Sequence, residues 1–240
     1  MLTNKTLPHR GWKIAALICG LLGCLCFGAG DWLMLYGDPT YSGSLSWLTE
    51  GAAGIASWRN GLAMGLAFPG VLLYGIALFS LESYIAPPRG KRVYRYLTAF
   101  GLTPWLCLHL FYIMILFTFG WMRQNGMSNA SAVCEAMFNH LQWLPLASEV
   151  LMIPPFLYWF YLQITGKTVF PRAMAFTNVL VIYGVLYAVK SLLPVSAFRL
   201  GFTNGLMSES MAVWFLLLLL TGVSALNRRK SKRIDEEETT

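Results

Sequence analysis

The chain has 240 residues, of which 56% are hydrophobic and 12% are charged, and its formal net charge is +7. Soluble domains carry about 25% charged residues, so this composition excludes an ordinary soluble domain and indicates an integral membrane protein. The positive charge does not predict nucleic-acid binding, because the Lys and Arg residues flank long apolar segments and form no single basic region.

Six apolar segments are long enough to cross a bilayer, which takes about 20 apolar residues. Backbone polar groups in a bilayer must be hydrogen-bonded within the segment, so each segment is predicted to be a helix. The sequence therefore predicts an all-α membrane protein, a bundle of six transmembrane helices that forms one domain over residues 1–240. In chain order the predicted spans are about 12–36, 61–81, 96–121, 143–165, 170–193 and 205–226.

The first span contains an acid, Asp31, near its far end. The positions that share a helix face with Asp31 are Gly28, Phe27, Cys24 and Gly20. Small residues mark the side of a membrane helix that packs against another helix. Asp31 is therefore predicted to face the interior of the bundle. An alternative, that this segment is a cleaved signal, would leave an odd number of spans.

The connection between the first two spans contains aromatic and small residues at helical spacing, Trp47, Gly51, Ile55 and Trp58. Trp is enriched at membrane surfaces, so we expect a helix lying at the outer interface here. Gly61 and Gly65, at the start of the second span, have the spacing of a helix-packing motif.

The later spans carry four more ionisable residues. Glu149 and Glu209 follow the outer starts of the fourth and sixth spans, and Lys190 precedes the outer end of the fifth. His109 lies deeper, near the middle of the third span. Because such residues are costly in a bilayer, they mark candidate functional positions.

Two further features concern the helices themselves. Pro154 and Pro155 remove two backbone donors from the fourth span, which is expected to kink or break. The tail, residues 227–240, changes from basic to acidic and is predicted to be disordered, with its basic half near anionic lipid.

The distribution of Lys and Arg predicts the orientation. Fourteen of the 18 flank one side of the predicted membrane, at the N-terminus, the second and fourth connections and the tail. Basic flanks face the cytoplasm, so both termini are predicted to be cytoplasmic in the inner (plasma) membrane of the cell.

With this orientation, Asp31, Glu149, Lys190 and Glu209 lie at similar depth near the outer surface, and we predict that they line a polar pocket that opens outward. The alternative is that each has a local role, as a snorkelling Lys or as a charge at a helix end.

Three hypotheses for function remain open. Paired carboxylates are typical of an intramembrane enzyme acting on a lipid or amphiphile, with His109 as a weaker candidate. Intramembrane acids also serve small proton- or cation-coupled transporters and solute-binding membrane proteins. A scaffold with structural charges is the third hypothesis. The sequence predicts contact with membrane lipid and a lipid or small-molecule ligand, but leaves metal, cofactor and oligomeric state open.

The stretch "GAGDWLMLYGDP", which contains Gly30, Asp31, Tyr36 and Gly37, together with the six-span layout, resembles bacterial integral membrane families of unknown function. The resemblance implies a multi-pass helical membrane protein and carries no catalytic residue over to this chain.

Overall fold

The computed structural model describes residues 7–37, 55–141 and 143–238. Regular structure in these ranges is helical, without β-strands. The helices are α1 (Leu7–Leu35), α3 (Ser57–Ser80), η1 (Leu81–Tyr84), α4 (Pro88–Gln124), α5 (Ala130–Leu141), α6 (Trp143–Ile164), η2 (Arg172–Thr177), α7 (Val179–Leu192) and α8 (Ala197–Glu238).

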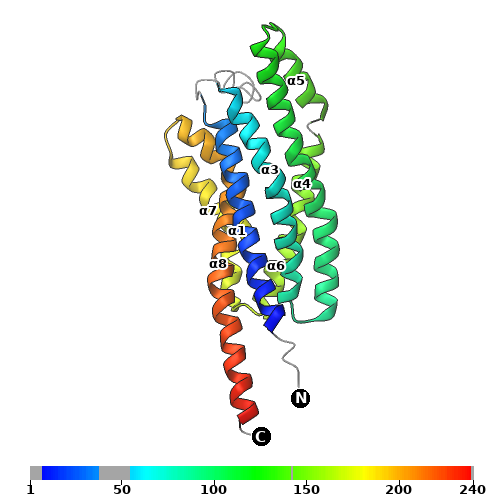
Figure 1. The fold of residues 1–240 in the computed structure, drawn as a ribbon, viewed down its shortest axis with the longest axis vertical. Helices are drawn as coiled ribbons and strands as arrows, with labels where there is room; N and C mark the ends of the chain where they lie inside the picture. Colours follow the sequence, from blue (N-terminus) through cyan, green and yellow to red (C-terminus); the bar gives the residue numbers. More distant parts are fainter. Residues whose placement is uncertain (1–6, 38–54, 142, 239–240) are drawn as a thin grey trace.

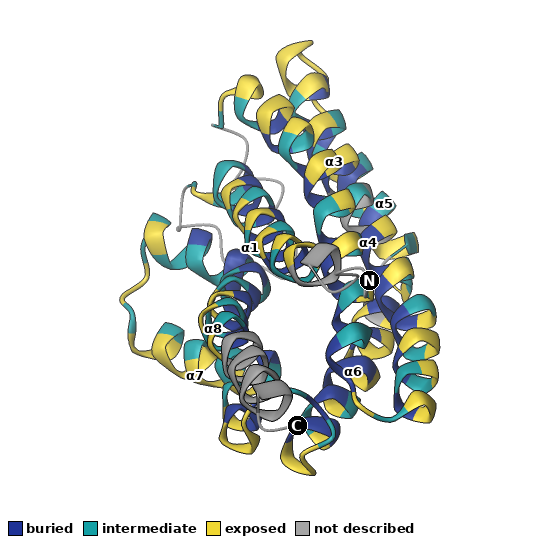
Figure 2. Cartoon of the chain, turned by 60° about the horizontal axis from the view of Figure 1, so that its bottom comes forward, coloured by how far each residue is buried: buried dark blue, intermediate teal, exposed yellow. Residues whose placement is uncertain are grey.

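The long helices run up and down one bundle (Figure 1). Helix α1 packs against α3 and α8, α4 packs against α3 and α6, and α7 packs against α8. Helix α1 begins and α8 ends at the same end of the bundle, which we call the lower end, and α5 lies at the opposite, upper end. Buried residues lie on the sides of the helices that face one another, and exposed residues lie outside (Figure 2).

Three helices among the described residues are long and apolar enough to cross a membrane. They cover Gly11–Leu35, Ser57–Tyr84 and Ala197–Ser224. These three correspond to the first, second and sixth predicted spans. The chain is therefore an all-helical protein with at least three helices of membrane-spanning length.

The fifth predicted span, 170–193, is not one helix. It divides into η2 and α7 at Asn178, whose side chain accepts a hydrogen bond of 3.0 Å from the backbone N–H of Leu180. This is the N-cap interaction that starts a new helix. Helix α7 has 14 residues, which gives it a length of about 21 Å, short of the roughly 30 Å hydrocarbon core.

The two prolines of the fourth predicted span do not break it, because α6 runs continuously from Trp143 to Ile164 with both prolines inside. Pro155 has no N–H, so the carbonyl of Leu151 loses its usual partner within the helix. Gly101 of α4 packs directly on that carbonyl oxygen. The freed carbonyl therefore lies in a protein interface and does not interrupt the helix.

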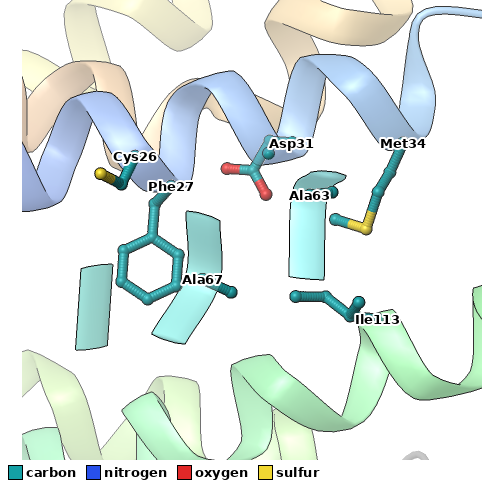
Figure 3. Close-up of a pocket in the computed structure, with 8 residues that line it drawn as sticks. Cys26, Phe27, Asp31, Met34, Ala63, Ala67 and Ile113 are labelled. Carbon is teal, nitrogen blue, oxygen red and sulfur yellow. The ribbon is translucent and has the colours of Figure 1, made fainter. Parts of the chain in front are cut away.

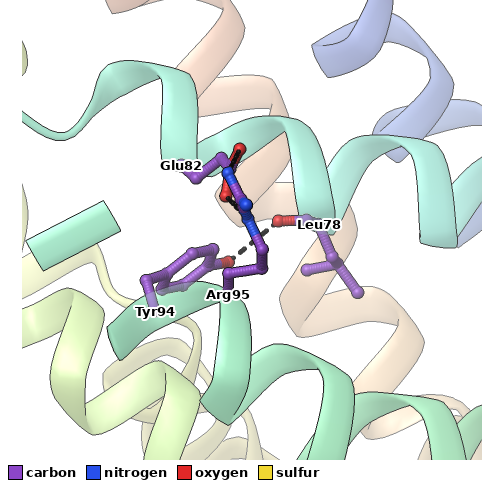
Figure 4. Close-up of polar contacts among 4 residues, drawn as sticks. All are labelled: Leu78, Glu82, Tyr94 and Arg95. Atoms are coloured by element: carbon purple, nitrogen blue, oxygen red, sulfur yellow. Dashed lines mark hydrogen bonds and ion pairs between the residues drawn. The ribbon is translucent and has the colours of Figure 1, made fainter. Parts of the chain in front are cut away.

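The third predicted span begins earlier than expected, because α4 starts at Pro88, a favoured first helical position. Its basic first turns are hydrogen-bonded to the end of α3 and to η1 (Figure 4). Arg95 forms two hydrogen bonds of 2.7 Å with the carboxylate of Glu82, and the Tyr94 hydroxyl donates to the Leu78 carbonyl at 3.1 Å.

The short helix α5 was not predicted. Its buried side consists of Ala130, Cys134 and Phe138, spaced four residues apart, and the helix packs on α4. Burial raises the pKa of the Cys134 thiol above its ordinary value, so this thiol stays protonated at neutral pH. The four-residue spacing is the sequence signal that identifies this helix in retrospect.

Two other expectations differ from the structure. Residues 227–238 continue α8 as helix, where a disordered tail was expected, consistent with the high helix propensity of Arg, Lys and Glu. A Cβ atom added at Gly61 or Gly65 would meet no other described atom within 4 Å, so this motif packs against no described helix. The expected interfacial helix lies mostly in 38–54, outside the described residues, and Trp58 belongs to α3.

Candidate functional site

Asp31 lies on the interior side of α1, as predicted from its helix face, with only 5% of its surface exposed. Ser208 of α8 donates a hydrogen bond of 2.9 Å to its Oδ2 atom. A Cβ atom added at Gly28 would lie 3.7 Å from Ser208 Cβ, so the glycine surface of α1 lets α8 approach here. The packing of α1 on α8 thus brings the hydroxyl to the acid.

A small hollow adjoins Asp31, without space for a water-sized molecule. Figure 3 shows the Asp31 carboxylate directed into the space between α1 and α3, with Ile113 of α4 on the opposite side. The other lining residues are apolar or small: Cys26, Phe27, Gly30, Met34, Ala63 and Ala67. Sites for drug-sized ligands measure roughly 300–1,000 Å³. This hollow has no space for a water-sized molecule, so a proton is the occupant that fits it without movement of the lining side chains.

Glu209 is the second acid at this position. Its Oε1 atom accepts a hydrogen bond of 2.8 Å from the indole N–H of Trp32, the residue that follows Asp31. Its Oε2 atom is buried and has no hydrogen-bond partner among the described residues. Glu209 and Asp31 are close enough to interact electrostatically. We call Asp31 and Glu209 the acid pair.

Two glycines of α8 make room for the Trp32 side chain. A Cβ atom at Gly201 would lie 2.8 Å from the indole ring. A Cβ atom at Gly205 would lie 3.1 Å from both Trp32 Nε1 and Glu209 Oε1. Any larger residue at Gly205 would therefore press on the hydrogen bond that holds Glu209. The edge of Phe198 also packs against the Trp32 ring, with a centroid distance of 5.2 Å.

Two residues near the acid pair were not identified from the sequence. Tyr74 of α3 is fully buried beside Cys24 and Ser208, and its hydroxyl interacts electrostatically with Asp31. Arg59, at the start of α3, donates to the backbone carbonyls of Trp32 and Tyr36 at 3.2 and 3.0 Å. A cation at the C-terminus of α1 complements the partial negative charge of that helix end. Tyr74 and Arg59 were missed because the site was predicted from the charged residues and histidines inside the spans. Tyr74 is uncharged, and Arg59 precedes the second span.

The other predicted site residues lie elsewhere or cannot be placed. Glu149 is exposed on α6 and interacts electrostatically with Tyr183 of α7. Lys190 lies over the ring of Tyr187 on its own helix, 4.8 Å from the ring centroid. Among the described residues, no ion pair joins Lys190 to the acid pair. The side chain of His109 lies outside the described part of the chain.

The chemistry available at this position is that of two carboxyl groups in a mostly apolar setting. No group of three or more His, Cys, Asp or Glu side chains in the described part of the chain could hold a metal ion. Two neighbouring carboxylates that both carry charge repel each other, and burial increases the free-energy cost of keeping both charged. A proton or a small cation between them would remove the repulsion.

Comparison with known proteins gives a family but no function. Residues 11–225 match the model of DUF6796, described as a family of unknown function. The searches of curated proteins and of solved structures gave no match.

Proposed function

We propose, from the premise that this chain belongs to the DUF6796 family of unknown function, that it is a multi-pass membrane protein whose acid pair binds a proton or a small monovalent cation. The observation that carries the proposal is the Oε2 atom of Glu209, which is buried without a hydrogen-bond partner among the described residues and lies near Asp31. Buried charges are paired, neutralised or bound to an ion, because an isolated one is too costly.

The proposed topology has six crossings, with both termini in the cytoplasm and the lower end of the bundle facing it. The bias of Lys and Arg supports this orientation. The shared position of the start of α1 and the end of α8 supports an even number of crossings. In this topology η2 and α7 form one discontinuous crossing, which is tolerated where the break is buried in protein. Asn178, at the break, is 1% exposed.

The acid pair then lies in the outer half of the membrane. Acids in membrane helices that face the bundle interior are typical of proton and cation sites. The hollow beside Asp31 has no space for a water-sized molecule, so a proton fits it as it stands, whereas a cation would require the lining side chains to move. The proposed activity is therefore proton- or cation-dependent binding, the first step of a coupled transport cycle.

The geometry gives less support to an enzyme that acts on a lipid or amphiphile. Such a substrate would need a larger site than the hollow beside Asp31. A scaffold with purely structural acids is the remaining alternative, and the following experiment separates it from the proposal.

The test measures Tm for the full-length protein in lipid nanodiscs. One series varies pH from 5 to 8, and another titrates Na⁺, K⁺ or Li⁺ with choline replacing each ion at constant ionic strength. A ligand that binds only the folded state raises stability by about 2.7 kcal/mol at 100 times its Kd. For a chain of this size that corresponds to a rise in Tm of about 5–10 °C.

We expect Asp31→Asn and Glu209→Gln to abolish this dependence, because each removes one charge of the pair. Glu149→Gln, which neutralises an exposed acid of α6, is the matched control and should respond like the wild type. If wild type and all three variants shift in parallel, or none shifts, the acids are structural and the protein is no cation- or proton-binding protein at this site.

A further inference from the structure

A second group of buried polar side chains lies apart from the acid pair. Gln163, Trp159 and Trp214 are each 0% exposed. Both polar atoms of the Gln163 amide and the indole nitrogens of the two tryptophans have no hydrogen-bond partner among the described residues. We call these three residues the amide–indole cluster. Native proteins leave few buried polar atoms unpaired, and each one calls for an explanation.

Trp159 meets Trp214 between α6 and α8, and Gln163 lies one helical turn further along α6. Trp159 and Gln163 are four residues apart, so they lie on the same side of α6, roughly 5–6 Å from each other at their Cβ atoms. The Trp159 ring contacts that of Trp214 in α8 with a centroid distance of 6.2 Å. The Tyr94 ring of α4 contacts Trp159 at 5.6 Å. The cluster is thus built by α6 and α8, and α4 packs against it through Tyr94.

The chain that follows α6 closes the lower end of the bundle near this cluster. The Lys167 N–H bonds to the Leu162 carbonyl at 2.7 Å, and the Ala86 N–H bonds to the Lys167 carbonyl at 2.8 Å. Val169 bonds to Tyr84 at 2.9 Å, and Phe170 packs on the Trp159 ring with a centroid distance of 6.1 Å. This connection separates the cluster from the surface.

We propose that the amide–indole cluster binds ordered water. Two indole N–H groups and the amide NH₂ offer donors, and the amide oxygen offers an acceptor, so the occupant must both accept and donate hydrogen bonds. Water does both, and buried waters characteristically make about three hydrogen bonds to otherwise unpaired groups. The indole and NH₂ donors disfavour a cation. This inference does not depend on the proposed function of the acid pair.

The test is X-ray hydroxyl-radical labelling of the full-length protein in nanodiscs, read by mass spectrometry. Radicals produced from bound water oxidise side chains beside it, even where bulk solvent has no access. We expect oxidation of Trp159, with little oxidation of Phe119, a residue of α4 that is 1% exposed and serves as the control. Labelling in ¹⁸O-enriched water identifies water as the source of the added oxygen.

A variant identifies the groups that hold the water. Gln163→Leu should abolish Trp159 oxidation and lower Tm by a few degrees, because the water loses a donor and an acceptor. If wild-type Trp159 is oxidised no more than Phe119, the cluster is dry and the proposal is wrong. If Gln163→Leu keeps the oxidation, or raises Tm as expected when an unpaired amide is removed, the assignment to Gln163 is overturned.

Discussion

At the acid pair, two adjacent residues of α1 form hydrogen bonds with different residues of α8. Asp31 accepts from Ser208 of α8, and Trp32 donates to Glu209 of the same helix. Consecutive helical positions point about 100° apart, so both can meet α8 only where the two helices pack closely. Gly201 and Gly205 provide that close packing, because the Trp32 ring occupies the space of their missing side chains.

Replacing Trp32 by Phe removes the indole N–H and leaves a smaller aromatic ring in its place. Glu209 Oε1 would lose its donor, and Oε2 already has no partner in the described chain. We expect the free energy of unfolding to fall by about 1–3 kcal/mol, measured by denaturant titration in mild detergent.

A double-mutant cycle with Glu209→Ala is the control for this prediction. If the hydrogen bond is the cause, Trp32→Phe should cost much less in the Glu209→Ala background than in the wild type. Equal costs in the two backgrounds would mean that Trp32 stabilises the protein through ring packing alone.

At Gly101, α4 meets the backbone of α6. Gly101 lies on the Leu151 carbonyl, which Pro155 leaves without its usual partner. A Cα–H can approach such an oxygen closely, and weak Cα–H···O contacts recur at helix interfaces. This contact places the carbonyl freed by Pro155 against another helix, where it does not interrupt α6.

We therefore predict that Gly101→Ala destabilises the protein, because a Cβ atom would collide with a backbone oxygen that cannot rotate away. Overpacking of this kind costs about 1–3 kcal/mol, measured as a fall in the free energy of unfolding.

Gly65→Ala is the matched control, since a Cβ atom there meets no described atom within 4 Å. It should be neutral or slightly stabilising, because Ala has the higher helix propensity. A large loss of stability at Gly65 would instead point to a partner helix on that face of α3.

In the whole molecule, successive long helices run in opposite directions. Their directions predict which connections lie on the same side of the membrane. The turn that contains Gly126 lies at the upper end, whereas Ala86 and Gly166 lie in connections at the lower end. In the proposed topology, which rests on the Lys and Arg bias, the lower end faces the cytoplasm.

This orientation predicts the activity of topology reporters in a bacterial host. Fusions of alkaline phosphatase, which is active only outside the cytoplasm, should be active after Gly126 and inactive after Ala86 or Gly166. Fusions of green fluorescent protein at the same positions should give the reverse pattern. Equal phosphatase activity after Ala86 and Gly126 would contradict a crossing by α4.

The composition and the long apolar segments determined the class of the protein, because bilayer-length helices follow from local sequence. The glycine face of α1 determined that Asp31 points inward, since a helix face is fixed by spacing alone. By contrast, α5 and the division at Asn178 depend on short-range packing and capping that hydropathy does not resolve.

Only the tertiary structure decided which charges meet. The four predicted pocket residues were grouped because they lie at similar depth in the membrane. Depth along a helix does not determine the rotation of the helix about its axis, or which helices are neighbours. The packing of α8 on α1 brought Glu209 to Asp31. Glu149 instead interacts electrostatically with Tyr183 of α7, and Lys190 lies over Tyr187 of its own helix. Contacts between distant segments depend on the mutual orientation of helices, which the periodicity of each one alone leaves undetermined.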